Sequence, residues 1–178
     1  LILAATLSSN YGMYGPAFEL MENTPVEPGK EEYLDSEKYE IRQWDFDSPG
    51  SLRKIIKRIN QLRKENRALQ NTRSLTFHPI DNDALIGYSK ITDDMGNMIL
   101  VVVNLDPYHT QGGWIRLPLL RFGLDPHEPF QVHDLLSGAF FLWSGETNFV
   151  EIDPGVMPAH IFKLRRKVRT ERDFDYFM

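Results

Sequence analysis

The chain has 178 residues, of which 42% are hydrophobic and 25% charged, the proportions of a globular protein of one domain or a domain and a half. Its net charge of −5 disfavours a nucleic-acid partner, because neutralising a phosphate backbone requires a basic surface. It contains no cysteine, which excludes disulfides and thiolate metal sites and fits a reducing, cytoplasmic compartment, and no apolar run approaches the roughly 18 residues that cross a bilayer.

The N-terminal part of the chain alternates apolar runs with a long loop. Residues 1–7 (LILAATL) are expected to be the last turns of a buried helix, so that the chain begins inside a structural element. Residues 11–15 (YGMYG) form a short apolar run between glycines, which is typical of a buried strand. An acidic loop follows over residues 21–47, and residues 31–39 within it are expected to form one or two helical turns.

The clearest helix is predicted over residues 49–69, where apolar positions recur every three or four residues and therefore share one face. Ser48 or Ser51 can cap its first turn, because a hydroxyl oxygen accepts hydrogen bonds from the free N–H groups there. The predicted buried face consists of Leu52, Ile55, Ile56, Ile59, Leu62, Asn66 and Leu69.

From residue 72 onward the hydrophobic period changes to two, and turn residues separate short apolar runs. This pattern predicts an antiparallel β-sandwich. Residues 98–103 are apolar on both faces, so this strand is expected to be central and covered on each side. The predicted strands are 74–78, 84–91, 98–104, 113–117, 130–134, 139–143, 149–152 and 159–164.

Candidate catalytic patterns are weak. Close carboxylate pairs such as Asp45/Asp47 and Asp81/Asp83 lie in predicted loops, where solvated turn acids are the simpler interpretation than a glycosidase pair. The five histidines lack the i, i+4 spacing of a zinc motif, and no phosphate loop or nucleophile elbow is present. We therefore expect no metal and no cofactor. Sugar rings could stack on Trp44, Trp114 or Trp143, although core packing is the simpler interpretation of each tryptophan.

The order of these elements resembles the end of an enzyme of the α-amylase clan, in which a (β/α)8 barrel closes and a C-terminal sandwich follows. Residues 8–20 (SSNYGMYGPAFEL) and 31–42 (EEYLDSEKYEIR) resemble the α-1,4-glucan:maltose-1-phosphate maltosyltransferases more narrowly. Residues 134–138 (DLLSG) and 158–162 (PAHIF) also fit the sandwich domain of that family.

The resemblance implies a mainly β fold with three parts. Residues 1–71 would be the C-terminal end of a catalytic barrel with its last helix, strand and helix, residues 72–165 an all-β sandwich, and residues 166–178 a charged tail. Enzymes of this family move maltosyl units from maltose 1-phosphate to the non-reducing end of α-1,4-glucans, in glycogen synthesis, by a retaining double displacement. Their catalytic acids are expected upstream of Leu1, so no catalytic residue is expected in this chain, which alone should be inactive.

Substrate-binding residues follow from the same resemblance. Lys38 and Tyr39 match a Lys-Tyr pair that contacts the non-reducing sugar of the donor, and Asn10, Tyr11 and Glu19 are secondary candidates near a strand end. No metal, nucleic acid or membrane partner is implied. The alternative is that the sandwich serves as a carbohydrate-binding or scaffold module of another α-amylase-type glucan hydrolase.

The resemblance also bears on the 49–69 helix. Most of its barrel neighbours would lie outside this chain. Only residues 1–7, the 11–15 strand and the sandwich would be left to cover its apolar face. If those do not suffice, Ile55, Ile59 and Leu62 are expected to be partly exposed, or to be covered by a second copy of the chain in a homodimer.

Overall fold

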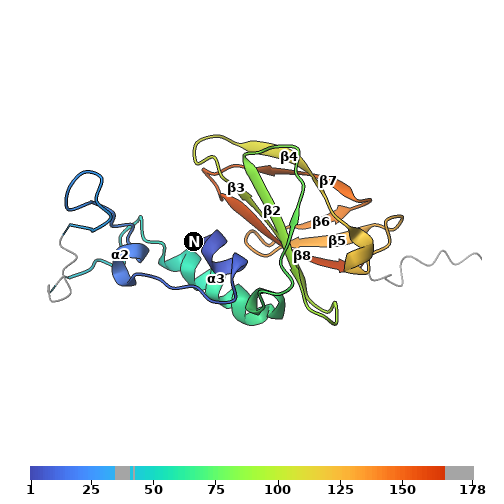
Figure 1. Cartoon of the computed structure of the whole chain (residues 1–178), viewed down its shortest axis with the longest axis horizontal. Coiled ribbons are helices and arrows are strands. Elements are labelled where there is room, and N and C mark those ends of the chain that lie inside the picture. The colour runs from blue at the N-terminus through green and yellow to red at the C-terminus, as the bar shows by residue number, and fades with distance from the viewer. Residues whose placement is uncertain (35–40, 42, 167–178) are drawn as a thin grey trace, which may run out of the picture.

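Two antiparallel sheets dominate the computed structural model, which describes residues 1–34, 41 and 43–166 (Figure 1). The larger sheet has the order β1 (Thr76–His78), β2 (Leu85–Ile91), β3 (Met98–Asn104), β8 (Ala159–Arg166), β5 (Phe130–Asp134) and β6 (Phe140–Trp143). The smaller sheet pairs β4 (Gln111–Arg116) with β7 (Thr147–Ile152). A short 3-10 helix, η2 (Leu119–Phe122), follows β4. The predicted mainly β sandwich is confirmed, and each predicted strand forms within two residues of its expected ends.

Strand β3 is buried on both faces, as its continuous apolar run predicts. Met98, Leu100 and Val102 point into the core between the two sheets, together with Ile115 of β4. The alternate residues of β3 belong to a second core on the other face of the large sheet. The large sheet is therefore the middle layer of three.

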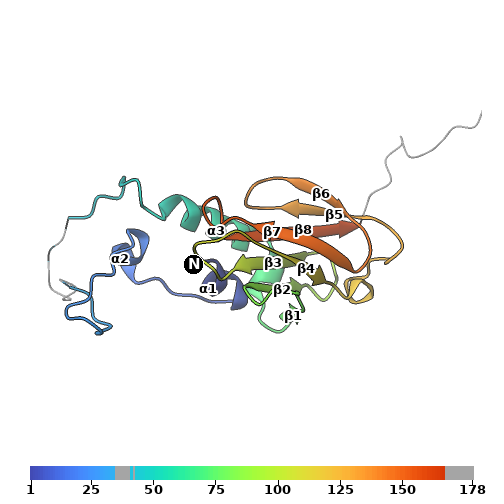
Figure 2. The same ribbon diagram turned by 90° about the horizontal axis from the view of Figure 1, so that it is seen from above.

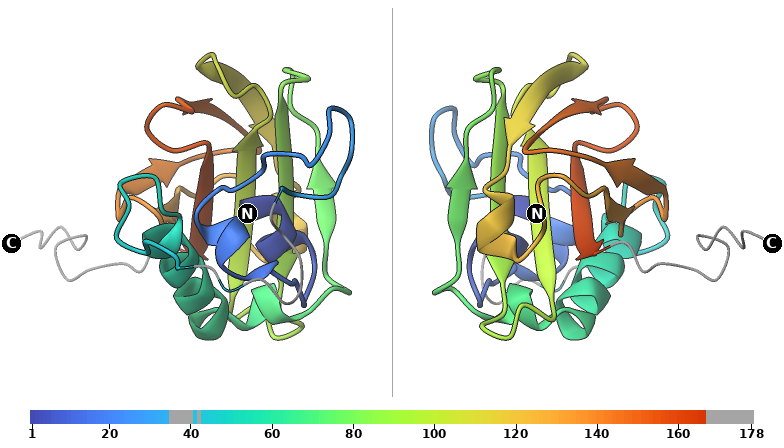
Figure 3. Two further views of the ribbon diagram at one scale, coloured as in Figure 1. Left: turned by 90° about the vertical axis from the view of Figure 1, so that its left-hand side faces the viewer. Right: turned by 90° about the vertical axis from the view of Figure 1, so that its right-hand side faces the viewer.

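Helices form the third layer. Helix α1 (Ile2–Leu7), helix α3 (Arg53–Glu65) and the 3-10 helix η1 (Arg67–Gln70) lie against the face of the large sheet that the small sheet leaves open (Figures 2 and 3). In the part of the chain that the structure describes, no helix has the length and apolar character needed to span a membrane.

Helix α3 is covered within one chain. Ile59 and Leu62 are fully buried against α1 and the sheet, so these elements suffice to cover them and no second copy of the chain is needed there, whereas Ile55 is half-buried. The physical reason is that the large sheet offers an apolar face wide enough for both helices. The helix also begins later than predicted, at Arg53, whose N–H lies 3.3 Å from Ser51 Oγ.

Two asparagines fasten the end of this helix to the sandwich. Asn66 Nδ2 donates to the Leu62 carbonyl at 2.9 Å, and Asn66 Oδ1 accepts from Asn97 Nδ2 at 2.9 Å. Asn97 Oδ1 in turn accepts the N–H of Ala68 in η1. The polar Asn66 on the predicted apolar face is therefore buried as a bridge to the β2–β3 turn.

The predicted strand at residues 11–15 does not form. Residues 10–14 have no regular structure, and Gly15–Glu19 form a short helix, α2. Pro16 suits the first turn of a helix because its missing N–H would be unpaired there, and both sheets lie away from α2, so no strand is available as a partner (Figure 1). Residues 31–34 are not helical, and the remainder of the predicted 31–39 turns lies outside the described residues.

Candidate functional site

Of the predicted donor-site residues, Lys38 and Tyr39 lie outside the described residues, whereas Tyr11 is fixed to helix α3. The Tyr11 hydroxyl donates to Asn60 Oδ1 at 2.5 Å, and the guanidinium carbon of Arg63 lies 5.0 Å from the centroid of its ring. The Tyr11 side chain thus faces the helix and is half-buried.

Arg63 holds the whole segment that leads to Tyr11. Its guanidinium donates to the carbonyl oxygens of Ala5, in the last turn of α1, and of Ser8 and Ser9, just after that helix ends. A planar cation with five donors suits such a cluster of acceptors. The segment from α1 to Tyr11 is therefore positioned by Arg63 and Asn60 of α3, and the N–H of Ser9 also donates to Thr72 Oγ1.

Glu19 and Asn10 are placed differently. The Glu19 carbonyl accepts the N–H of Leu52 at 2.7 Å, and its carboxylate atom Oε1 is buried without a hydrogen-bond partner among the described residues. Asn10 is exposed. Leu52 and Asn60 are eight positions apart, which corresponds to roughly 12 Å along a helix. The structure therefore spreads the contacts of Tyr11 and Glu19 along α3.

A pocket of about 380 Å³ lies between the β5–β6 turn and the β7–β8 turn. His160 Nδ1 lies 3.0 Å from Asp134 Oδ2, and Ser137 Oγ donates to the same carboxylate oxygen at 2.5 Å. His160 Nε2 lies 3.2 Å from the Glu151 carbonyl oxygen. The pocket is lined by Asp134, Leu136, Ser137, Glu151, Asp153, Val156, Met157 and His160.

This serine, histidine and aspartate do not form a nucleophilic triad. A triad needs the histidine to accept the serine proton, but Ser137 donates to Asp134 and both ring nitrogens of His160 face acceptors. Burial alone would lower the pKa of His160, yet the Asp134 carboxylate outweighs it and raises that pKa. The hydrogen bonds of this group tie β8 to the β5–β6 turn, and the His160–Asp134 contact is an ion pair when His160 is protonated.

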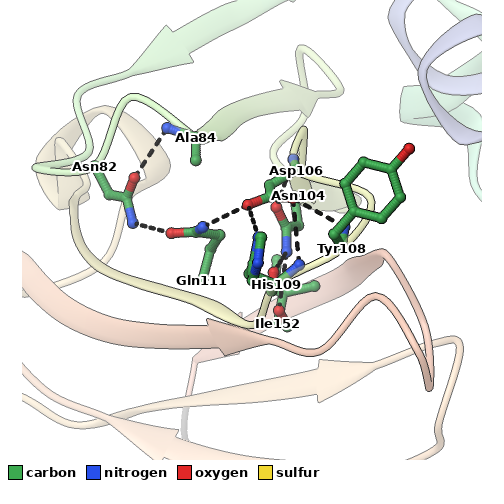
Figure 4. Close-up of polar contacts among 8 residues, drawn as sticks. All are labelled: Asn82, Ala84, Asn104, Asp106, Tyr108, His109, Gln111 and Ile152. Atoms are coloured by element: carbon green, nitrogen blue, oxygen red, sulfur yellow. Dashed lines mark hydrogen bonds and ion pairs between the residues drawn. The ribbon is translucent and has the colours of Figure 1, made fainter.

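A second polar cluster surrounds Asp106 in the β3–β4 loop (Figure 4). Its carboxylate accepts from the backbone N–H groups of Tyr108 and His109, from His109 Nδ1 and from Gln111 Nε2. These hydrogen bonds, led by that from the Tyr108 N–H, lower the pKa of Asp106 to about 2. Gln111 also accepts from Asn82, so the cluster holds this loop against the β1–β2 turn.

A second pocket, of about 390 Å³, borders His78. His78 Nε2 lies 2.8 Å from Ser89 Oγ, and burial, with the nearby charge of Arg121, lowers the pKa of His78 to about 4. A neutral, hydrogen-bonded histidine of this kind supports packing. Among the residues that the structure describes, no three histidine, aspartate or glutamate side chains gather as a metal site would require.

Comparison with known proteins assigns the chain to a family. Residues 77–164 match the family model described as "GLGE, C-terminal". Over 169 residues, 92% of this chain, it is 56% identical to the α-1,4-glucan:maltose-1-phosphate maltosyltransferase of Chlorobaculum tepidum. It is 50% identical over 163 residues to the enzyme of the same name from Methylacidiphilum infernorum. The chain belongs to the α-1,4-glucan:maltose-1-phosphate maltosyltransferase family.

The match covers only part of those maltosyltransferases, because the chain spans 25% and 24% of their respective lengths. Solved structures show the same fold in more distant proteins. An α-amylase from Geobacillus thermoleovorans superposes with a TM-score of 0.59 at 17% identity, over 94% of this chain and 33% of that one. An Anoxybacillus α-amylase gives 0.52 at 15% identity, over 72% and 25%.

Two motifs that resemble the maltosyltransferase sandwich meet in the structure. Asp134 and Ser137 belong to DLLSG, and His160 to PAHIF, and the Asp134–His160 contact joins them. Sequence reasoning treated the motifs separately, because the pairing of β5 with β8 is not visible in the sequence. The sequence signal that could have suggested this contact was an aspartate at the end of one predicted strand and a histidine near the start of another.

The tryptophans divide into two kinds. Trp143 packs at the core between the sheets, where its ring centroid lies 6.2 Å from that of Phe130 and 5.3 Å from that of Phe162. Because these rings cover it, Trp143 is not a sugar-stacking surface. Trp114 is 52% exposed on the outer face of the small sheet. Trp114 is therefore the more accessible of these two rings, and Trp44, outside both sheets, is half-buried.

Proposed function

We propose that this chain is part of an enzyme that transfers maltosyl units from maltose 1-phosphate to the non-reducing end of α-1,4-glucans, with retention, by double displacement. The 56% identity to a protein of that name over 92% of the chain carries the proposal. Glycogen or α-glucan synthesis would be the corresponding role, and the absence of cysteine supports a cytoplasmic location.

Within that enzyme, residues 1–71 would end the catalytic barrel, residues 72–165 would form the C-terminal sandwich, and residues 166–178 a charged tail. Two observations support this division. The "GLGE, C-terminal" model falls inside the sandwich, and the likeness to an α-amylase extends over 94% of the chain. The catalytic acids would then lie outside these 178 residues, and this chain alone would be inactive.

The donor sugar would be contacted by Lys38 and Tyr39, with Asn10, Tyr11 and Glu19 nearby. The support is the match of the 31–42 segment to the family. Replacing Lys38 with alanine in the whole enzyme should raise the KM for maltose 1-phosphate at least tenfold, about 1.4 kcal/mol of binding. Lys30→Ala is the matched control, since Lys30 is an exposed lysine of the same loop, paired with Glu27 at 3.2 Å.

Phosphate release from maltose 1-phosphate in the presence of glycogen tests the activity. We expect release by the whole enzyme and none by the 178-residue chain. Turnover by the chain alone, or no transfer by the whole enzyme, would contradict the proposal.

The exposed Trp114 favours a second candidate, a carbohydrate-binding module of a glucan hydrolase. In that case the whole protein would hydrolyse glycogen and ignore maltose 1-phosphate.

A homodimer also remains a proposal. Burial of Ile59 and Leu62 within one chain removes the original ground for it, but the edge strand β6 exposes Phe140, Phe141 and Leu142. Unpaired backbone groups beside exposed apolar side chains suit pairing with a second copy. Sedimentation equilibrium of the whole enzyme should show a dimer that Leu142→Lys weakens, and a monomer at all concentrations would reject this proposal.

A further inference from the structure

The outer face of the small sheet carries two exposed aromatic rings side by side. Trp114 of β4 and Phe149 of β7 are cross-strand partners, 52% and 49% exposed. Their ring centroids are 5.4 Å apart and the ring planes are inclined by 60°. This aromatic platform, defined as Trp114 and Phe149, faces away from the layer formed by α1 and α3, with the large sheet between them (Figures 1 and 3).

Gly112 leaves room for the platform. Strand positions two apart share a face, so Gly112 lies on the same outer face as Trp114. A Cβ atom at Gly112 would lie 2.7 Å from Cζ of Phe149, closer than real Cβ contacts. The Phe149 ring therefore lies across β4 where only a glycine permits it.

Neighbouring polar contacts hold the platform in place. The N–H of Trp114 donates to Asp81 Oδ1 at 2.6 Å, which fixes the backbone of β4 from the β1–β2 loop. Arg116, next along the same face, pairs with Glu146 at 3.4 Å. Thr147 and Glu151, on β7, are also exposed on this face. The rings are thus flanked by side chains that can exchange hydrogen bonds with a polar ligand.

We propose that the aromatic platform binds an α-1,4-glucan chain. A glucose ring has apolar C–H faces and a rim of hydroxyl groups, so it matches an exposed aromatic face bordered by Arg116, Glu151 and Thr147. Successive units of an α-1,4-linked chain turn relative to one another, which suits rings inclined by 60° better than it suits the flat ribbon of a β-1,4-glucan. The choice of this ligand rests on the proposed function, in which the same polymer is the acceptor.

The composition of the surface favours a sugar over a protein partner. A protein-binding patch is expected to be contiguous and apolar, as the Phe140–Phe141–Leu142 run of β6 is. The platform instead consists of two ring faces between charged and hydroxyl side chains. A glucan held there would be bound through the apolar faces of the sugar rings that lie on the platform, while its other sugar units stay free.

Calorimetric titration of the 178-residue chain with maltoheptaose tests the proposal. We expect saturable binding, weakened about tenfold by Trp114→Ala and by Phe149→Ala, which is the effect of about 1.4 kcal/mol. Gly112→Val should weaken binding similarly, because it displaces the Phe149 ring without removing it. Phe140→Ala is the matched control, since Phe140 is 60% exposed on the other sheet, and it should leave binding unchanged. Far-UV circular dichroism confirms that each variant is folded.

Labelling with 5-fluorotryptophan gives a second measurement that needs no substitution. Maltoheptaose should shift the fluorine resonance of Trp114 and leave that of the packed Trp143 in place. No saturable binding, equal binding of cellohexaose, or equal weakening by Phe140→Ala would overturn the proposal. Because this assay involves no transfer, it can fail while the whole enzyme still releases phosphate from maltose 1-phosphate, and it can succeed where that activity is absent.

Discussion

His160 Nδ1 lies 3.0 Å from Asp134 Oδ2, and the other ring nitrogen of His160 lies 3.2 Å from the Glu151 carbonyl oxygen. A carboxylate and a carbonyl only accept hydrogen bonds, so this environment favours an imidazole with a proton on both nitrogens. The contacts join β8 to the end of β5 in the large sheet and to β7 in the small sheet. His160 therefore links the two layers, and the link carries a charge when the imidazole is protonated.

The stability contributed by this link should depend on pH. Burial alone would lower the pKa of His160, but Asp134 raises it above the ordinary 6.5. A raised pKa means that the contribution is complete below pH 6.5 and is lost as pH rises through the folded-state value. We expect His160→Gln to lower the free energy of unfolding by roughly 1 kcal/mol at pH 6, with a smaller difference at pH 9.

Urea unfolding of both proteins from pH 4 to pH 9 measures this effect. At the acid end the link should also weaken, because hydrogen bonds from His160, Ser137 and the Leu136 N–H hold the pKa of Asp134 below 3.8, despite its burial. The difference between the two proteins should therefore be largest between about pH 4 and 6.5. A difference that stays constant from pH 4 to pH 9 would show that folding leaves the pKa of His160 unchanged, and would contradict the charged contact with Asp134.

His78 should behave in the opposite sense. Burial, assisted by Arg121, lowers its pKa to about 4, so the folded protein holds it neutral where the unfolded chain binds a proton. Its contribution is complete above pH 6.5 and is lost as pH falls toward 4. The imidazole of His78 should therefore show nitrogen chemical shifts of a neutral ring at pH 5.5 in ¹H–¹⁵N NMR spectra. A protonated ring at that pH would contradict the lowering of the His78 pKa by burial.

Helix α3 should be a major source of stability in the isolated chain. Ile59 is fully buried between α1 and the large sheet, so Ile59→Ala creates a cavity and should lower the free energy of unfolding by about 2–4 kcal/mol. Lys57→Ala, on the exposed side of the same helix, should change it by less than about 0.5 kcal/mol. Denaturant melts of the two variants measure both values, and equal small losses would show that the helix does not pack on the sandwich.

The period-two pattern was sufficient to predict the strands, because a half-buried strand must alternate its side chains. It predicted β5 to the residue, and a continuous apolar run predicted β3 to the residue. The partners of each strand were not predictable, since the β5–β8 pairing joins segments far apart in sequence. Residues 11–15 were mistaken for a strand because local composition says nothing about the absence of a neighbouring strand. Trp114 and Trp143 looked alike in the sequence, and only their sheet faces distinguish a surface ring from a core ring.

A buried lysine gives a last prediction. Lys90 of β2 is only 1% exposed, and its Nζ atom has no hydrogen-bond partner among the described residues. Burial, together with the charge of Arg63, lowers the pKa of Lys90 to about 8. A buried, unpaired ammonium group costs free energy, so a methionine of similar length should fit better. We expect Lys90→Met to raise the free energy of unfolding by about 1–2 kcal/mol at pH 7.

This gain should depend on pH in a defined direction. Between about pH 8 and 10.5 the unfolded chain binds the lysine proton and the folded protein does not, so the native protein becomes more stable as pH rises and approaches the variant. Lys57→Met, at an exposed position of α3, is the matched control and should stay within about 0.5 kcal/mol of the native protein at every pH. A loss of stability in Lys90→Met at pH 7 would mean that the ammonium group has a favourable partner, and the predicted pH dependence would then be absent.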